Sequence, residues 1–338
     1  MPPTLRRTRG GKIDAFTLIY REGHREGLYR SSLSWGREGR ALVRVDRVAI
    51  VGVGLIGGSI GLALKNRALA CEVVGVGRDQ ATLDLAVQLG AIDRGTTDLV
   101  DAVSHAQVVV VCTPVGRIAD DVRRAAESAP AGVLVTDAGS SKRQIVEAVE
   151  RHPRSATVFV GAHPLAGSER RGAQHARADL FDGRVCVLTP TPRTRLDRSR
   201  LARNFWGALG CRVLEMSPAE HDEIVAHTSH LPHAVAAALA SSIPPQWLPL
   251  AAGAYRDGTR VAAADTGIWT AIFRDNRGPL LKALGTLQER LDAFKYALMT
   301  DDEQAISQWW IEARERRGLF DAQLDSPDPT QDPAYRST

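Results

Sequence analysis

The stretch Arg47–Ser59 reads RVAIVGVGLIGGS and decides the fold. Its first part, Arg47–Val51, is a short apolar run typical of a buried strand, and it ends directly in a G-x-G-x-x-G motif. The first glycine of that motif allows a tight turn, the second lets the backbone approach a pyrophosphate, and the third lets the next helix pack closely on the strand. The N-terminus of that helix attracts phosphates. We therefore favour a dinucleotide-binding turn over a bare glycine-rich turn, with these residues: Gly52, Gly54, Leu55, Ile56 and Gly57.

Apolar runs typical of strands alternate with helical patterns along the next hundred residues. This alternation predicts an α/β, Rossmann-like fold with a doubly wound parallel sheet. After about residue 215 no strand signal remains, so we expect an all-helical domain to follow. The further strands are expected at Glu72–Val76, Gln107–Cys112, Val133–Thr136 and Thr157–Val160, with helices such as Asp79–Leu89 and Arg117–Glu127 between them.

The all-helical domain begins with a clear start signal. Ser217 can cap a helix, Pro218 fits its first position, and Glu220 can complete a capping box. The segment that follows, to about Ser242, is apolar nearly all round, which predicts burial in a large core or in a subunit interface. Pro232 within it predicts a kink. The expected domains are a weakly ordered basic extension (1–44), a dinucleotide-binding domain (45–215), a helical domain (216–318) and a disordered tail (319–338).

Composition narrows the class of protein. Residues 1–44 carry a net charge of +6 and the whole chain +4, so residues 45–338 sum to −2. The basic charge therefore lies in the extension, which argues against nucleic-acid binding. No run of 18 uncharged apolar residues exists, so we expect no membrane-spanning helix. Four scattered cysteines without a C-x-x-C pair predict reduced thiols in the cytoplasm and no zinc site.

The end of the second strand bears on the choice of cofactor. Dehydrogenases that use NAD usually place an acidic residue there to hold the ribose 2′-hydroxyl. Here that position is Gly77, followed by Arg78, an arrangement that favours the 2′-phosphate of NADP over NAD. Asp79 can still reach a ribose, and Arg78 can be a simple surface residue, so NAD remains the alternative.

Three polar clusters follow predicted strands: Cys112–Pro114, Asp137–Lys142 and His163–Glu169. Ligands of open α/β sheets bind outside the carboxyl ends of the strands, so these clusters are expected to converge. His163 can accept a proton there as hydride leaves a substrate, although a structural loop histidine is the alternative. His227, His230 and His233 recur at three-residue spacing, but no cysteine or carboxylate motif accompanies them, so no metal is expected.

Five segments together resemble prephenate dehydrogenases, the family that includes arogenate dehydrogenases. The similarity covers roughly residues 45–318. The resemblance implies oxidative decarboxylation of prephenate to 4-hydroxyphenylpyruvate in tyrosine biosynthesis, with hydride transfer to NAD(P), and a homodimer formed through the helical domain. The segments are Gly52–Ser59, Asp137–Lys142, His163–Glu169, Ala178–Phe181 before Leu188–Pro190, and His221–His233 ending in SHLPH.

The resemblance also implies roles for individual residues. His163 would accept the proton of the ring hydroxyl, and Ser140 would hold that hydroxyl near the nicotinamide. Arg260 would bind a substrate carboxylate, Glu169 and Asp257 would form gating ion pairs, and Gly253 would lie near the partner's site. The implied substrate-binding set is Arg260, His233, Asp222, Glu169, Asp257, Trp269 and Gly253; Thr113 and Pro114 join the cofactor-binding set.

Other substrates and other classes of protein are also compatible with these residues. Arogenate or an amino-substituted prephenate differs from prephenate only near the side chain or ring substituent. A β-hydroxyacid dehydrogenase or a non-enzymatic dinucleotide sensor would share the glycine-rich turn but would not need Ser140, His163 and Arg260 together. The extension is too short for a fused chorismate mutase and the tail too short for an ACT domain. We also expect that translation starts near Val43 or Val45; a translated basic tail is the alternative.

Overall fold

The computed structural model describes residues 34–35, 41–42, 45–167 and 170–325. The chain divides into two compact units, Met1–Arg277 and Gly278–Thr338. Most of the predicted extension and the last 13 residues of the predicted tail lie outside the described residues, as does Glu169. Within the extension, β1 (Ser34–Trp35) and β2 (Ala41–Leu42) pair as antiparallel strands.

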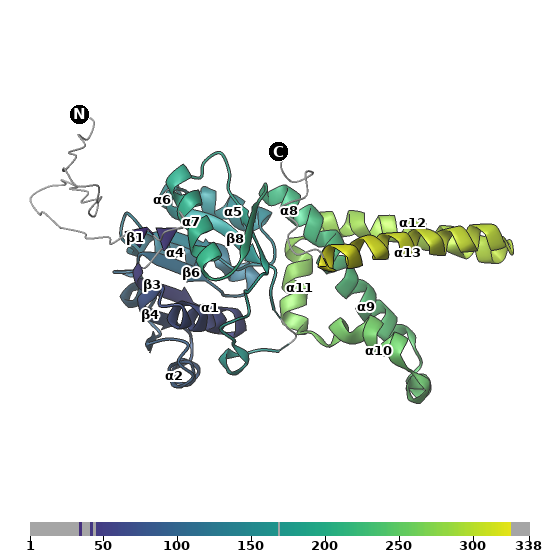
Figure 1. Ribbon diagram of the computed structural model, residues 1–338, viewed down its shortest axis with the longest axis horizontal. Coiled ribbons are helices and arrows are strands. Elements are labelled where there is room, and N and C mark those ends of the chain that lie inside the picture. The colour runs from purple at the N-terminus through teal and green to yellow at the C-terminus, as the bar shows by residue number, and fades with distance from the viewer. Residues whose placement is uncertain (1–33, 36–40, 43–44, 168–169, 326–338) are drawn as a thin grey trace, which may run out of the picture. The chain divides into compact units, whose positions relative to one another are not determined.

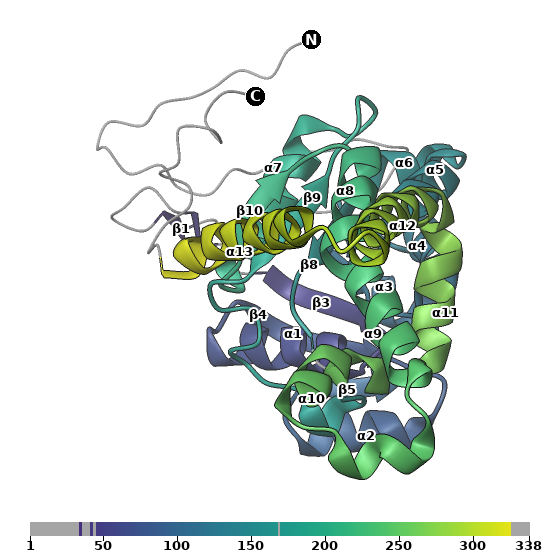
Figure 2. The same ribbon diagram turned by 90° about the vertical axis from the view of Figure 1, so that its right-hand side faces the viewer.

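The first unit contains an eight-stranded sheet in the order β10-β9-β8-β7-β6-β3-β4-β5. Helices cover both of its faces (Figures 1 and 2). The predicted fold class is confirmed, and the five predicted strands are present within a few residues of their expected bounds. The strands are β3 (Val45–Val51), β4 (Ala70–Val76), β5 (Arg94–Thr96), β6 (Val108–Val111), β7 (Leu134–Asp137), β8 (Phe159–Pro164), β9 (Val185–Thr189) and β10 (Arg212–Glu215).

The sheet is not parallel throughout, which corrects the expectation of a purely parallel sheet. β8 and β9 pair antiparallel, whereas all other neighbours in the sheet pair parallel. In the connection from β8 to β9, the described residues (165–167 and 170–184) contain a short 3-10 turn, Ala173–His175, and no crossover helix. Without a crossover helix the chain does not return to the starting edge, so β9 runs the opposite way.

Two apolar cores separate the helices into layers. On one face α1, α2 and α7 pack on alternate residues of the strands, with Trp206 fully buried. On the other face α3, α4, α5 and α6 pack on the intervening residues. The bounds are α1 (Leu55–Asn66), α2 (Gln80–Gln88), α3 (Leu99–Val103), α4 (Val115–Ser128), α5 (Arg143–Glu150), α6 (Pro153–Val158) and α7 (Leu196–Ala208).

The first unit continues with helices after the sheet. The side chain of Ser217 caps α8 by accepting a hydrogen bond from the backbone N–H of Glu220, 3.2 Å away. A π-helical turn lies just before Pro232, where a kink was predicted; the kink itself stays a prediction. The helical elements are α8 (Pro218–Val225), the π-helical turn (Ala226–His230), α9 (Leu231–Ser242), α10 (Gly253–Thr259), α11 (Thr266–Asp275), and 3-10 turns at Pro245–Leu250 and Arg260–Ala263.

The second unit holds α13 (Glu303–Asp325) and nearly all of α12 (Arg277–Met299). Phe294 stacks on Trp309 with ring centroids 4.5 Å apart, and Arg290 pairs with Glu312. α13 continues to Asp325, so the segment after residue 318 begins as helix, contrary to the expected disorder from 319. The residues after Asp325 are not described.

Candidate active site

The glycine-rich turn has the geometry that a dinucleotide requires. Gly52 has φ +95°, and a Cβ there would lie 2.8 Å from the carbonyl oxygen of Cys112. A Cβ on Gly57 would lie 2.1 Å from the carbonyl oxygen of Gly52, so only glycine allows α1 to approach the turn. Nothing lies within 4 Å of a Cβ on Gly54, and no side chain caps α1. The N–H groups of its first turn are therefore left to bind phosphates, so the turn fits a pyrophosphate.

The residues after β4 have separate partners. The carboxylate of Asp79 caps α2 by accepting hydrogen bonds from the backbone N–H and the hydroxyl of Thr82. The hydrogen bond from the Thr82 hydroxyl is the largest cause that lowers the pKa of Asp79, and the hydrogen bond from the backbone N–H adds to it. Arg78 is exposed, and within the described part of the chain it has no hydrogen-bond or ion-pair partner. Asp79 is thus engaged in its own helix, whereas Arg78 is available to a ligand.

Asp137, at the carboxyl end of β7, joins two of the predicted clusters. Its Oδ1 atom accepts a hydrogen bond from the N–H of Ala162 in β8 (2.9 Å). Its Oδ2 atom accepts from the N–H of Gly139 (2.9 Å) and forms a fully buried ion pair with Lys142. These bonds fix the loop that carries Ser140 beside the end of β8, which carries His163.

His163, His221 and Asp222 form a chain of hydrogen-bonded side chains. The Nδ1 atom of His163 lies 2.8 Å from the Nε2 atom of His221, and the Nδ1 atom of His221 lies 2.8 Å from the Oδ1 atom of Asp222. A carboxylate only accepts hydrogen bonds, so the proton of neutral His221 is on Nδ1 and its Nε2 accepts. His163 must then donate from Nδ1, which leaves a lone pair on its Nε2. This chain therefore fixes the tautomer of His163 in the form that a general base needs.

The surroundings keep His163 uncharged. Burial is the main cause that lowers the pKa of His163 well below its usual value, and His221, Lys142 and His230 act in the same direction. Burial also lowers the pKa of His221, although the hydrogen bond to Asp222 opposes it. At neutral pH both rings are neutral, as the tautomer argument requires.

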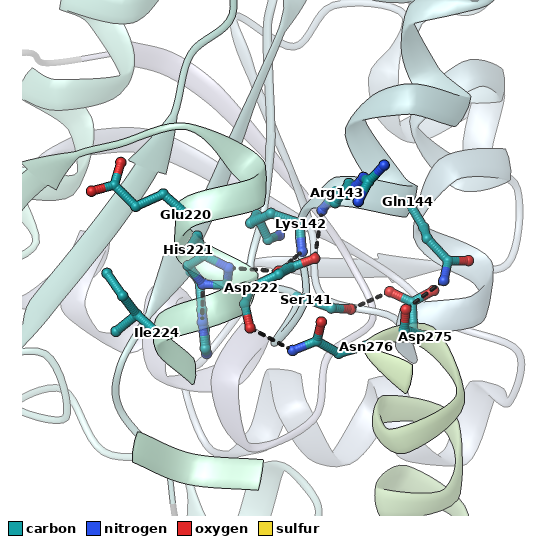
Figure 3. Close-up of polar contacts among 12 residues, drawn as sticks. Ser141, Lys142, Arg143, Gln144, Glu220, His221, Asp222, Ile224, Asp275 and Asn276 are labelled. Carbon is teal, nitrogen blue, oxygen red and sulfur yellow. Dashed lines mark hydrogen bonds and ion pairs between the residues drawn. The ribbon is translucent and has the colours of Figure 1, made fainter. Parts of the chain in front are cut away.

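Asp222 also ties the helices that follow the sheet to the start of α5 (Figure 3). Its two carboxylate oxygens accept hydrogen bonds from the N–H groups of Lys142 (2.8 Å) and Arg143 (2.9 Å). Beside this contact, the hydroxyl of Ser141 donates to the carboxylate of Asp275, whose pKa is raised chiefly by burial. Ser140 thus lies in a loop whose next three residues are all anchored by side chains from α8 and α11.

A second group of predicted residues gathers around Trp269. The ring of His233 stacks on it with centroids 3.6 Å apart, and the ring of His230 meets it nearly at right angles at 6.0 Å. The Nδ1 atom of His233 donates to the backbone carbonyl of Ser229, 2.9 Å away. Burial lowers the pKa of His233, and the nearby charge of Arg260 adds to this effect. His233 and Trp269 are therefore in direct contact, and the charge of Arg260 acts on His233.

Several predicted residues have other surroundings. Arg260 is exposed in the single chain. Asp257 pairs with its sequence neighbour Arg256, and both are largely exposed. Gly253 begins α10 and is partly exposed. The hydroxyl of Thr113 donates to Asp121, and Pro114 directly precedes α4 at its N-cap position. Glu169, with its expected gating role, lies outside the described residues.

Sequence reasoning assigned no role to His221, Lys142 and Asn276. His221 precedes Asp222 in the segment already singled out, so an adjacent His-Asp pair was a visible signal. Lys142 ends the Asp137–Lys142 cluster and is its only cation. No sequence signal marked Asn276, because its contacts come only from tertiary packing.

The fold and this site together define a nicotinamide-dinucleotide-dependent oxidoreductase. The chain belongs to the prephenate dehydrogenase family. Residues 60–215 match the family's nucleotide-binding domain, and residues 217–311 match its dimerization domain.

Individual relatives agree with this family. The prephenate dehydrogenase of Bacillus subtilis is 29% identical over 302 residues, covering 84% of this chain and 81% of that protein. The cyclohexadienyl dehydrogenase of Zymomonas mobilis is 30% identical over 277 residues, covering 80% of this chain and 94% of that protein. The structure of prephenate dehydrogenase from A. aeolicus in complex with hydroxyphenyl propionate and NAD+ matches with a TM-score of 0.76 and 31% identity, over 81% of this chain and 98% of that chain. The structure of Synechocystis arogenate dehydrogenase matches with a TM-score of 0.70 and 28% identity, over 81% of this chain and 99% of that chain.

Two other features are absent from the described part of the chain. Among the described helices, none is long and apolar enough to cross a membrane. Within the same residues, no three His, Cys, Asp or Glu side chains are grouped closely enough to hold a metal ion.

Proposed function

We propose that this chain catalyses the oxidative decarboxylation of prephenate to 4-hydroxyphenylpyruvate in tyrosine biosynthesis. The observation that carries the proposal is the chain His163–His221–Asp222, which leaves a lone pair on the Nε2 atom of a neutral histidine. That histidine lies at the carboxyl end of β8, in the same sheet whose β3 leads into the dinucleotide turn. Both relatives and solved structures of this family support the substrate class.

In this mechanism the protein has two tasks, orientation and the transfer of one proton. The bound nicotinamide supplies the hydride acceptor. Ser140 holds the ring hydroxyl, and His163 accepts its proton at Nε2 as hydride leaves the ring carbon. The ring carboxylate departs as carbon dioxide, its bonding electrons enter the ring, and the ring oxygen takes the proton back from His163 to give the phenol; aromatisation makes the reaction favourable. The buried Asp137–Lys142 pair keeps the loop of Ser140 in place.

The group around Trp269 is proposed to bind the substrate. Arg260 binds a carboxylate, and His233 and Trp269 form an adjacent wall. A guanidinium binds a carboxylate through charge-assisted hydrogen bonds. Asp222 orients the ring of His221 and holds the start of α5, and its effect on the substrate is therefore indirect. Asp257 and Glu169 are proposed to form gating ion pairs on substrate binding.

We propose NADP as the preferred cofactor. Gly77 removes a carboxylate that would repel a 2′-phosphate, and a Cβ there would already meet Leu83 at 3.1 Å. Arg78 is exposed, while Asp79 is engaged in capping α2. The structure of the A. aeolicus relative contains NAD+, so NAD is the alternative cofactor.

We propose a cytoplasmic homodimer. The part of the chain that matches the dimerization domain exposes large apolar side chains, among them Leu250, 85% exposed, and Tyr296, 68% exposed. Exposed apolar surface of this kind is typical of an interface between subunits. The dimer would cover Arg260 and bring Gly253 near the partner's site. The four cysteines are free thiols, consistent with a reducing compartment.

Initial-rate measurements with prephenate and with arogenate, each with NAD and with NADP, test this proposal. We expect turnover of prephenate with either cofactor and a higher kcat/KM with NADP. Turnover of arogenate alone would replace the substrate, and Synechocystis arogenate dehydrogenase makes that the second candidate. No reduction of either cofactor with either substrate would contradict the proposed function.

A further inference from the structure

We propose that Asn276 is a positioning residue of the active site, which holds His230 in one neutral tautomer and thereby preserves the basicity of His163. Asn276 follows α11 and is only 1% exposed. Its side-chain nitrogen lies 2.7 Å from the backbone oxygen of Asp222 and 3.1 Å from the Nδ1 atom of His230 (Figure 3 shows the first contact). This one amide therefore contacts both the Asp222 segment and a buried histidine.

The chemistry of the two contacts fixes the direction of both hydrogen bonds. A backbone carbonyl oxygen only accepts, so the amide nitrogen of Asn276, and not its oxygen, must face Asp222. That nitrogen carries two hydrogens, and the second is directed to His230. The Nδ1 atom of His230 must then be an acceptor, so the proton of the neutral ring is on Nε2.

The same contact opposes protonation of His230. An imidazolium carries hydrogens on both nitrogens, and a hydrogen on Nδ1 would face the N–H of Asn276. Burial is the main cause that lowers the pKa of His230 to about 4. The charged or titratable groups that act on it are Asp222 and His221 of α8 and His233 of α9; Asp222 raises the pKa, and the two histidines lower it. The donor amide works in the same direction as burial.

Keeping His230 neutral matters to the base. A positive charge on His230 would lower the pKa of His163 further. If His230 were protonated, His163 would be a weaker proton acceptor, and turnover would fall because proton transfer depends on the basicity of the acceptor. Asn276 thus acts on the reaction through His230, without contact to the reacting atoms.

Substitution Asn276→Asp reverses this arrangement with almost no change of shape. A carboxylate accepts a hydrogen on Nδ1 of His230 and stabilises the imidazolium. We expect the acid limb of its kcat profile to move to higher pH by about one unit, so that kcat falls by up to about tenfold on that limb and changes little near neutral pH. Asn276→Leu, which removes the amide without adding charge, should lower thermal stability but leave the position of the acid limb closer to wild type. Asn204→Asp, on an exposed position of α7, is the control for an added charge.

The kinetic test rests on the proposed function. A direct measurement of the proton positions on His230 does not depend on that function. Neutron diffraction from crystals of the deuterium-exchanged full-length protein shows the deuterium on each ring nitrogen directly. We expect deuterium on Nε2 of His230 and none on Nδ1. Deuterium on Nδ1 would overturn the proposal, whatever the substrate. An acid limb in Asn276→Asp that coincides with wild type would also overturn it, because a purely structural role lowers activity evenly across pH.

Discussion

The Nδ1 atom of His163 lies 2.8 Å from the Nε2 atom of His221, and this contact decides which nitrogen of His163 is basic. His221 is itself oriented by Asp222, and Asp222 is held by two N–H groups at the start of α5. The base is therefore oriented by the same carboxylate that anchors the loop of Ser140. Orientation of donor, acceptor and base together is what this reaction asks of the protein.

Replacement of the base gives the first prediction. His163→Asn should lower kcat by roughly 10²–10⁴, the usual contribution of general acid–base catalysis. Binding of the dinucleotide, measured by titration calorimetry, should be little changed, because the glycine-rich turn follows β3 whereas His163 lies in β8. Turnover within threefold of wild type would show that another group accepts the proton.

Replacement of His221 tests the tautomer argument. His221→Phe keeps an aromatic ring but offers no acceptor to the Nδ1 atom of His163, so kcat should fall by about 10- to 100-fold. His221→Gln can still accept that hydrogen through its amide oxygen, and we expect it to retain much more activity. Equal losses in the two variants, at equal thermal stability, would mean that the hydrogen bond to His163 is not what matters.

The sequence was sufficient to predict the sheet but not all of its strands. The predicted runs were the buried, strongly apolar strands, such as Val108–Val111 in the middle of the sheet. Arg94–Thr96 was missed because three residues give no periodic signal, and the strands Val185–Thr189 and Arg212–Glu215 were not predicted either. The reversed direction of β9 was also missed, since strand direction depends on the connection before it and not on the residues of the strand.

For the site, the strand ends were predictable and the contacts across the fold were not. Ser140 and His163 follow from the rule that ligands bind at the carboxyl ends of strands. His221 lies 58 residues from His163 along the chain, and only the packing of α8 brings their rings together. The hydrogen bonds of Asn276 likewise depend on where α11 ends. Tertiary packing, rather than local pattern, determines these residues.

Substrate anchoring gives a third prediction. Arg260→Ala should raise KM for prephenate by about tenfold or more, since a charge-assisted hydrogen bond contributes about 1.5–3 kcal/mol and each 1.4 kcal/mol is a factor of ten. Arg203→Ala on α7 removes an exposed arginine elsewhere and is the control. If KM is unchanged in Arg260→Ala, another residue holds the carboxylate.

The cofactor preference gives a fourth prediction. Arg78→Ala should raise the dissociation constant of NADP by about tenfold, because one charge-assisted contact to the 2′-phosphate is lost. The dissociation constant of NAD, which lacks that phosphate, should change by less than about twofold. Fluorescence titration of both cofactors measures this, and equal weakening of both would return Arg78 to the role of a surface residue.

The buried histidines give a fifth prediction, on stability against pH. The pKa of His230 is about 4 in the folded chain and about 6.5 in an unfolded one. Between these values the unfolded chain binds the additional proton, so the free energy of unfolding should fall as the pH drops from about 6.5 to 4. For His230 alone the loss is roughly 3 kcal/mol, and the lowered pKa of His163 acts in the same direction.

Urea unfolding at pH 7 and at pH 5 checks this sign. His230→Gln removes the titrating group, so its free energy of unfolding should depend less steeply on pH than that of wild type. His227→Gln, on an exposed position of the same π-helical turn, is the matched control. If His230→Gln and wild type lose stability in parallel between the two pH values, His230 is protonated in the folded protein, and the neutral form required for its contact with Asn276 is not the one present.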